Sequence, residues 1–136
     1  MIQKEKQLLL KDLCARLPHK LHCRVFRLNG DIKENDDILY GVIGDNVVTL
    51  KSDKDECLMY YQIKPYLRPL SSMTEEEKMH FWCLNHNPNT GVDFMTHAPE
   101  LIDWLNSKYF DYRGLIPMGL ALPATKEMYK IESTSI

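Results

Sequence analysis

The chain has 136 residues, of which 26% are charged and 44% hydrophobic, and its 17 Lys and Arg against 19 Asp and Glu give a net charge of −2. That length fits one domain with a sizeable core. The charge balance lacks the basic excess that nucleic-acid-binding proteins gather on one face, and it is not acidic enough for a mimic of nucleic acid.

The N-terminal region predicts a cytoplasmic protein. Residues 1–7 are polar, and the run Leu8–Leu10 is far too short for the apolar core of a signal peptide. No apolar stretch approaches the length of a membrane span, so we expect no membrane partner. The cysteines are widely spaced without a C-x-x-C pair, which favours reduced thiols. They are Cys14, Cys23, Cys57 and Cys83.

Residues 3–17 predict an amphipathic helix, because apolar side chains recur at the spacing of one helical face. These side chains are Leu9, Leu10, Leu13, Cys14 and Leu17. The same pattern leaves four charged residues for solvent, namely Lys4, Lys11, Asp12 and Arg16. Pro18 disfavours helical geometry at the preceding residue and ends the helix there.

The strand-rich half, about residues 19–63, shows short alternating or β-branched runs separated by turn residues. The predicted strands are residues 21–28, 38–43, 47–51 and 57–61, the last of which also fits a helical turn. Residues 44–46 are a strong hairpin signal. We expect a curled antiparallel meander of about four strands that bends toward a partial barrel.

The hinge, residues 64–74, separates the strands from the helices. Pro65 and Pro69 fix φ and lack a backbone donor, so we expect an extended run that does not continue the interior of a sheet. Thr74 then opens a helix, with Glu77 reaching back to complete a capping box.

The helical half, residues 75–122, carries an unusually wide apolar face at its start. Met79, Trp82 and Cys83 form one set at helical spacing, and Phe81 and Leu84 form a neighbouring one. We therefore expect this helix to be buried against the strands.

A cluster of helix-breaking residues predicts a mobile loop from residue 85 to about 97. A third helix is expected to start around Thr96 and Pro99, with apolar residues along one side. Those residues are Leu101, Ile102, Leu105 and Tyr109. Asp111 is expected to cap a short turn over 112–116, and residues 120–122 to dock as an extended piece.

The predicted fold is a single α+β domain over residues 1–136. It consists of an N-terminal helix, the meander and two or three packed helices. The tail, about residues 126–136, has little to pack and is expected to fray.

The histidine and cysteine residues are potential metal ligands. They gather in two groups, His19, His22 and Cys23 in one, His80, Cys83 and His86 in the other. A zinc site would draw its ligands from His22, Cys23, Cys83 and His86. However, the second group rotates around its helix and the cysteines fit the apolar pattern, so we expect no metal and no cofactor.

Tyrosine and arginine side chains flank the junctions between elements and are over-represented in binding hot spots. The partner-binding candidates are Tyr66, Arg68, Tyr112 and Arg113, with Tyr109 beside them. The alternative is structural: Arg68 and Arg113 lock the helical half onto the meander through the five donors of each guanidinium, with Asp111 as a nearby acceptor.

Three segments carry distinctive sequence motifs. They are residues 9–18, residues 63–77 with the run KPYLRPLSSMTEEE, and residues 102–121 with the runs WLN, FDYRGLI and GLA. Together they resemble a family of small uncharacterised proteins from Bacteroides-type genomes and their prophages. The resemblance covers most of the chain, although Pro117 and Met118 depart from the polar, charged residues that family members carry there. It implies a mobile-element accessory protein and no catalytic residue.

We expect a non-enzymatic protein-binding or assembly module, with the oligomeric state left open. One alternative is a nucleic-acid-binding small β-barrel module, which would need its Lys and Arg to gather on one face. The other is an enzyme built from residues distant in sequence, which would need a deep pocket with a shifted acid or base.

Overall fold

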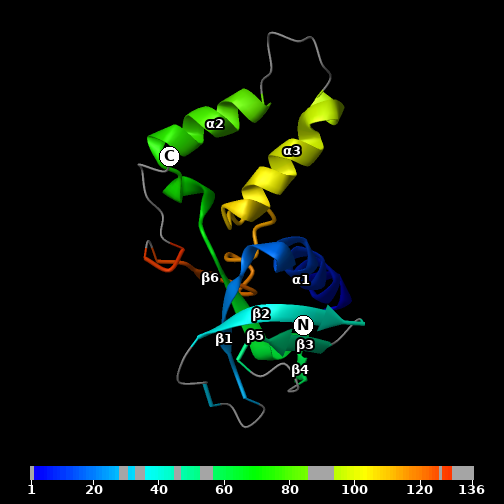
Figure 1. Ribbon diagram of the computed structural model, residues 1–136. Helices are drawn as coiled ribbons and strands as arrows, with labels where there is room; N and C mark the ends of the chain where they lie inside the picture. Colours follow the sequence, from blue (N-terminus) through cyan, green and yellow to red (C-terminus); the bar gives the residue numbers. More distant parts are fainter. Residues whose placement is uncertain are drawn as a thin grey trace.

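The structure is a computed structural model that describes residues 2–27, 31–32, 36–44, 47–52, 57–85, 94–125 and 127–129, with the backbone alone at 85 and 94–98. Its helices are α1 (Gln3–Arg16), α2 (Glu75–Asn85) and α3 (Phe94–Ser107), with 3-10 turns at Leu17–His19, Tyr60–Gln62 and Leu70–Ser72. Its strands are β1 (His22–Val25), β2 (Asp37–Ile43), β3 (Val47–Leu50), β4 (Leu58–Met59), β5 (Ile63–Leu67) and β6 (Leu122–Pro123). These elements (Figure 1) confirm the predicted α+β class.

The strands form one open, mixed sheet in the order β4-β3-β2-β1-β5-β6. The first four strands are the predicted meander, and each pairs antiparallel with the next. The predicted hairpin joins β2 and β3, where Gly44 takes a φ of +62°. The stretch 57–61 adopts both expected forms, a two-residue strand and then a 3-10 turn. Because β4 and β6 lie at opposite ends of the order, the described strands form an open sheet and do not close into a barrel.

The prediction that the hinge stays out of the sheet interior is wrong. β5 contains Pro65 and lies between β1, its antiparallel neighbour, and β6, its parallel neighbour. The reason is the register. Phe26 N–H donates to Gln62 O at 2.6 Å, so residues 62 and 64 turn their backbone groups toward β1 and Pro65 turns away from it. On that other side the β6 pairing begins only at Tyr66, and the missing donor breaks no ladder bond.

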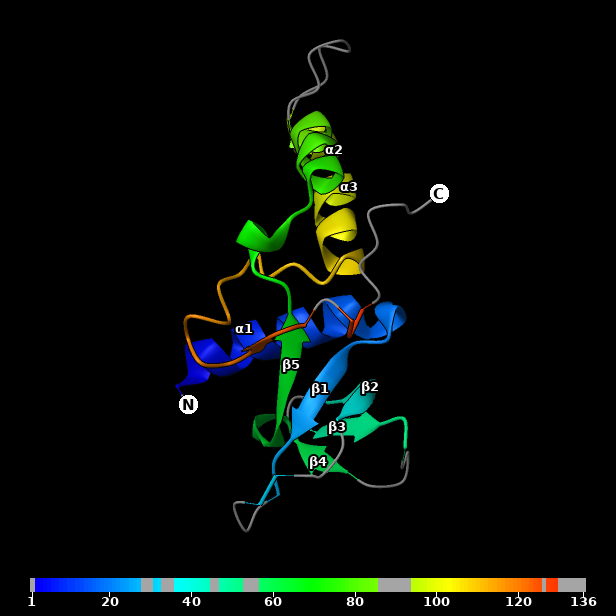
Figure 2. The ribbon, with the colours of Figure 1, turned by 90° about the vertical axis from the view of Figure 1, so that its left-hand side faces the viewer.

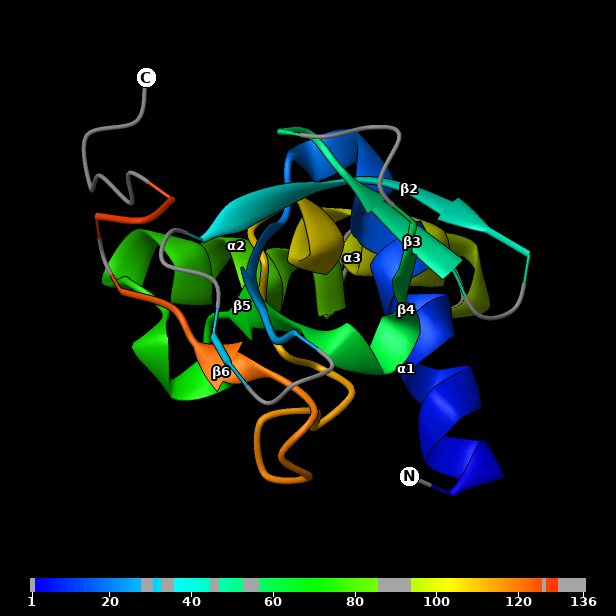
Figure 3. The same ribbon diagram turned by 90° about the horizontal axis from the view of Figure 1, so that it is seen from below.

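α1 is the middle layer of the molecule. In Figures 1 and 2 it lies across the sheet, while α2 and α3 stand on its opposite side. Viewed from the sheet side in Figure 3, β2 and β3 lie in front of it. Leu9 and Leu13 of α1 are buried with Leu39 and Val48 of the sheet, so the main core fills the space between these two layers.

The predicted N-terminal helix is confirmed, but its buried face is not the predicted one. Asp12 and Arg16, which the hydrophobic pattern assigns to solvent, are both 0% exposed, whereas Cys14 is exposed. The two charges are buried because each meets a partner from the segment that follows α3. A hydrophobic pattern along one helix does not register such a partner.

The helices α2 and α3, which we call the arm, pack on each other and project away from the sheet (Figure 2). The prediction that α2 buries a wide apolar face against the strands is therefore wrong. Its inner face packs into a second cluster of apolar residues at the base of the arm. That cluster contains Met73, Phe81, Leu84, Leu101, Trp104, Leu105, Phe110 and Tyr112.

The predicted capping box at the start of α2 is confirmed. The Glu77 backbone N–H donates to Thr74 Oγ1 at 3.2 Å, and the Thr74 N–H donates to Glu77 Oε1 at 2.9 Å. These two reciprocal bonds satisfy donors that the first turn of a helix leaves open. The direction of α2 is thus fixed from the hinge.

α3 differs from its prediction at both ends. It begins at Phe94, so Pro99 lies inside it, and it ends before Tyr109. Tyr109 has a φ of +65° and occupies the left-handed position after the helix, where Phe110 N–H donates to Leu105 O at 3.0 Å. The loop expected over 85–97 is shorter at both ends, and its residues 86–93 lie outside the described residues.

The C-terminal segment returns to the body of the protein. The expected extended piece is present as β6 beside β5. Further on, the ring of Tyr129 stacks on Tyr109 at 3.6 Å between centroids, and its hydroxyl donates to Tyr66 O at 2.7 Å. The prediction of a frayed tail is therefore wrong at Tyr129, which packs on the rest of the protein. Residues 126 and 130–136 lie outside the described residues.

Across the described ranges, no helix combines the length and the apolar character that spanning a bilayer requires.

The cysteines differ sharply in accessibility, which gives a first prediction. Cys23 is buried in β1, whereas Cys14, Cys57 and Cys83 are exposed, contrary to the expectation that all four pack inside. We expect DTNB to modify three thiols of the native protein quickly and the fourth only after unfolding in urea. The Cys23→Ser variant should lose only the slow thiol; fast modification of all four in the wild type would contradict this burial.

Candidate functional site

Two buried charges on α1 form the centre of a polar cluster. Arg16 Nε donates to Asp12 Oδ2 at 2.9 Å, and Arg16 Nη2 donates to Asp12 Oδ1 at 3.0 Å. The same Nη2 donates to the backbone carbonyl of Phe110 at 2.6 Å. The helical spacing of four residues aligns the two side chains, so the pair reaches the segment after α3 as one unit.

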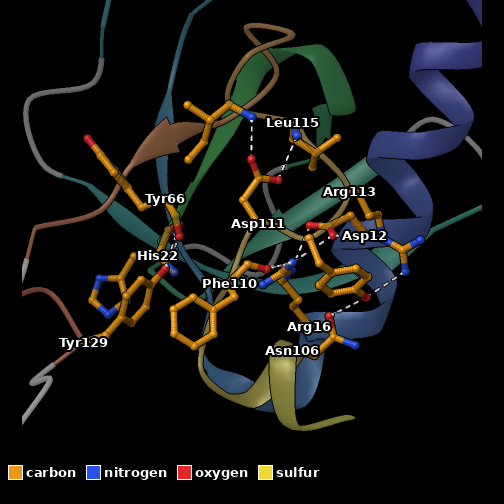
Figure 4. A network of polar contacts seen from close by, with 12 residues as sticks. Asp12, Arg16, His22, Tyr66, Asn106, Phe110, Asp111, Arg113, Leu115 and Tyr129 are labelled. Carbon is orange, nitrogen blue, oxygen red and sulfur yellow. Dashed lines mark hydrogen bonds and ion pairs between the residues drawn. The ribbon is translucent and has the colours of Figure 1, made fainter. Parts of the chain in front are cut away.

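A second arginine shares the same carboxylate. Arg113 Nε donates to Asp12 Oδ1 at 3.1 Å, and Arg113 Nη2 donates to the hydroxyl of Tyr112 at 2.9 Å. That hydroxyl donates to Asn106 Oδ1 at 2.9 Å. Figure 4 shows Asp12, Asn106 and Arg113 converging between α1 and the end of α3. We call Asp12, Arg16, Asn106, Tyr112 and Arg113 the arginine junction.

Asp111 has a different role from the predicted one, in which its carboxylate accepts hydrogen bonds from an arginine. Its carboxylate accepts the backbone N–H groups of Leu115 at 2.7 Å and Ile116 at 2.9 Å (Figure 4). It therefore caps the short turn, as predicted from its position. Arg113 instead pairs with Asp12 on α1, and Arg68 pairs with Glu77 on α2.

Arg68 joins β5 to the arm. It is 2% exposed, and its Nη1 and Nη2 donate to the two carboxylate oxygens of Glu77 at 2.7 Å each. Nη2 also donates to the carbonyl of Ser72 at 3.2 Å, and the guanidinium lies 4.2 Å from the centroid of the Phe110 ring. Two parallel charge-assisted bonds give this contact both strength and a fixed geometry.

Glu77 is held in its charged form by this contact. Burial by itself raises the pKa of the Glu77 carboxyl, but hydrogen bonds from Arg68 and Thr74 outweigh burial and keep that pKa below its ordinary value. The residue thus serves the capping box and the Arg68 pair at once. Its perturbed pKa is explained by structural contacts.

Tyr66 lies apart from the arginine junction. Its hydroxyl donates to Asp36 Oδ1 at 3.0 Å, and the guanidinium of Arg24 lies 5.6 Å from the centroid of its ring. Burial, followed by the interaction with Asp36, raises the pKa of the Tyr66 hydroxyl. Its backbone carbonyl is the one that accepts the Tyr129 hydroxyl.

The four candidate residues therefore do not gather on one surface. Tyr112 and Arg113 contact each other in the arginine junction, Arg68 contacts the base of α2, and Tyr66 contacts Asp36. Each polar end group is engaged by another part of the chain. These contacts favour the structural alternative for Arg68 and Arg113, with Glu77 and Asp12 as the partners that the sequence did not identify.

The histidines and cysteines show no metal-binding arrangement in the part of the chain that the structure describes, where no three ligand-type side chains gather. Cys23 is buried and its thiol lies 3.5 Å from the carbonyl of Asp37. The ring of His80 stacks on Trp104 at 4.9 Å. His86 lies outside the described residues.

Among the arm side chains that the structure describes, the most exposed large apolar residues lie on the outer face of α2. Met79 is 65% exposed, Trp82 is 51% exposed, and Cys83 lies beside them one helical turn from Met79. Phe81 and Leu84 on the opposite face account for the packing against α3. We call Met79, Trp82 and Cys83 the outer strip.

The sequence carries a signal for the outer strip, although the same wide apolar face predicts burial. Two sets of apolar residues lie on different faces of one helix, and a helix in a two-helix arm has only one inner face. Where only one face of such a helix packs into the core of the described residues, the exposed apolar residues of the other face are candidates for a contact.

Arg68 provides the second prediction. Replacing it with Ala strands the Glu77 carboxylate and should cost about 1–3 kcal/mol of unfolding free energy near neutral pH. The folded-state pKa of Glu77 lies below its ordinary value of 4.5, so the pair stabilises the fold above that pH. Its contribution is lost as the pH falls through the folded-state pKa.

The measurement is urea unfolding of wild type and Arg68→Ala over a range of pH, with Arg24→Ala as the matched control. Arg24 pairs with Asp36 at 4.0 Å with both side chains more than a third exposed. Its loss should cost less than about 1 kcal/mol at any pH. An Arg68→Ala cost no larger than that of Arg24→Ala, or one independent of pH, would contradict the buried pair.

No family model, curated protein or solved structure matches this chain. The resemblance to the Bacteroides-type family stays a prediction, and the functional assignment depends on the geometry of the arginine junction and the outer strip.

Proposed function

We propose that this chain is a non-enzymatic protein-binding or assembly module that acts in the bacterial cytoplasm as an accessory protein of a phage or other mobile element. The observation that carries the binding role is the outer strip of α2. The mobile-element context rests on the resemblance of the three sequence segments alone.

The outer strip has the composition of a contact site. Tryptophan and methionine are enriched at the centres of protein interfaces, where they supply large apolar area. Here Trp82 and Met79 lie one turn apart on a helix that projects from the body (Figure 2), so a partner can reach them without displacing the core. Holding the arm in place through the Arg68–Glu77 pair gives such a contact a rigid support.

The nucleic-acid alternative is weakened by where the arginines are used. Arg16, Arg68 and Arg113 are buried or nearly buried and pair with carboxylates of the same chain. They are not available for phosphate groups, which supply most of the affinity in nucleic-acid binding. The enzyme alternative finds no support in Glu77, because its lowered pKa follows from its pair with Arg68.

The third prediction tests the proposed function with immobilised protein and a lysate of its host. Wild type should retain at least one protein that the Trp82→Ala variant fails to retain. Met118→Ala, which removes another side chain that is 48% exposed, should behave like wild type. Because both side chains are about half exposed, the variants should unfold like the parent in urea. Identical retained proteins for all three baits would contradict the binding role of the outer strip.

A further inference from the structure

We propose that the ends of β1 and β5 and the turn after α3 form a binding slot for a phenol ring, which Tyr129 of the same chain fills as a removable latch. The C-terminal segment is then an intramolecular ligand of the body, separate from the core that carries the fold. This inference is independent of the outer strip and concerns how the tail controls the base of the arm.

The hydroxyl of Tyr129 lies between two strands where their backbones would otherwise pair. The register of β1 and β5 ends one step before His22 and Tyr66, which are the next opposed residues. There the Tyr129 hydroxyl accepts the His22 N–H at 3.0 Å and donates to Tyr66 O at 2.7 Å (Figure 4). Burial raises the pKa of this hydroxyl, so it stays protonated and serves both strands at once. The bottom of the slot thus offers one donor and one acceptor.

Two aromatic rings form the walls of the slot. The ring of Tyr109 stacks on that of Tyr129 at 3.6 Å between centroids, and the ring of His22 meets it edge-on at 5.0 Å. Both walls are held by contacts that do not involve the latch. The Tyr109 hydroxyl donates to His19 O, and His22 pairs with Ile38 of β2. The walls therefore keep their place when the ring between them leaves.

Tyr129 supplies the contacts that tie its segment to other elements. Of the two residues described directly before it, Glu127 is exposed, and the Met128 N–H donates within the segment to Thr125 O at 3.3 Å. A side chain held by hydrogen bonds and ring contacts can leave without breaking a helix or a strand. Such local openings cost less free energy than global unfolding. The latch can therefore open while the fold persists.

The latch acts on the base of the arm through Tyr109. That residue follows α3 with a φ of +65°, which a bulky side chain adopts only where its surroundings hold it. Its carbonyl accepts the Arg68 N–H at 2.7 Å, and the next residue, Phe110, donates its N–H to Leu105 O at 3.0 Å. Tyr129 covers one face of the Tyr109 ring. Release of the latch therefore loosens the junction between α3 and β5.

The test replaces the latch by a free ligand. Tyr129→Ala removes the ring, and phenol restores the missing ring and hydroxyl to the full chain. Benzene is the matched ligand without a hydroxyl. Tyr61→Ala is the matched control variant, because Tyr61 is 49% exposed and lies in the turn before β5. Hydrogen exchange at the backbone amides of Arg68 and Phe110, followed by NMR, measures opening of the junction. Urea unfolding measures the global fold, and sedimentation measures the oligomeric state.

In Tyr129→Ala, exchange at Arg68 and Phe110 should be about tenfold faster than in wild type or more, because two hydrogen bonds and a ring contact no longer oppose opening. Phenol on the order of millimolar concentration should restore most of the protection. Benzene should restore much less, since it leaves the donor and the acceptor of the slot unpaired. Phenol should not change the wild type, whose slot is filled, and Tyr61→Ala should exchange like wild type at both amides.

Wild-type exchange rates at both amides in Tyr129→Ala would overturn the proposal. So would faster exchange that phenol fails to slow, or that benzene slows equally. If Tyr129→Ala unfolds globally, Tyr129→Phe decides, because it keeps the ring and removes the hydroxyl. A folded Tyr129→Phe with faster exchange at the His22 amide supports the slot. Its unfolding, or unchanged exchange at that amide, would make Tyr129 part of the core and reject the latch. A wild-type dimer that Tyr129→Ala abolishes would place the ring in a second copy and also reject it.

Discussion

The structure depends on one buried carboxylate that two arginines share. Asp12 accepts from Arg16, one turn along α1, and from Arg113, 101 residues away, while Arg16 also holds the carbonyl of Phe110. Removing such charges from water costs several kcal/mol per ion, and only their mutual contacts offset that cost. The arrangement is therefore stable only when α1 and the segment after α3 are both in place. It makes α1 a middle layer instead of a surface helix.

This constraint explains how the arm is fixed to the rest of the protein and why some residues hold it in place while others remain exposed. The segment after α3 is fixed to α1 by the arginine junction and to β5 by backbone bonds on both sides of Arg68. Arg68 in turn fixes the start of α2 through Glu77. The motif residues that resembled a contact surface are thus used to hold the arm. We propose instead that Met79 and Trp82, which are exposed on the arm, form the contact surface.

Local rules predicted the local features. The capping box of Thr74 and Glu77, the β2–β3 hairpin and the turn capped by Asp111 all depend on residues a few positions apart, and all three are present. Prediction failed where the partner is distant in sequence. Nothing near Asp12 indicates Arg113, and nothing near Pro65 indicates that β6 begins pairing only at Tyr66. The apolar pattern of α2 was correct, but periodicity does not tell whether a neighbouring helix or solvent lies on each face.

A double-mutant cycle on Asp12 and Arg113, followed by urea unfolding, tests the central claim most directly. Asp12→Ala leaves two arginines without their shared carboxylate and should cost about 3–5 kcal/mol. With Arg113 already replaced by Ala, the same change should cost less, giving a coupling energy of about 1–3 kcal/mol. The exposed pair Glu75–Lys78 should show a coupling below about 0.5 kcal/mol. Additive effects at Asp12 and Arg113, within about 0.5 kcal/mol, would contradict the buried network on which this account is built.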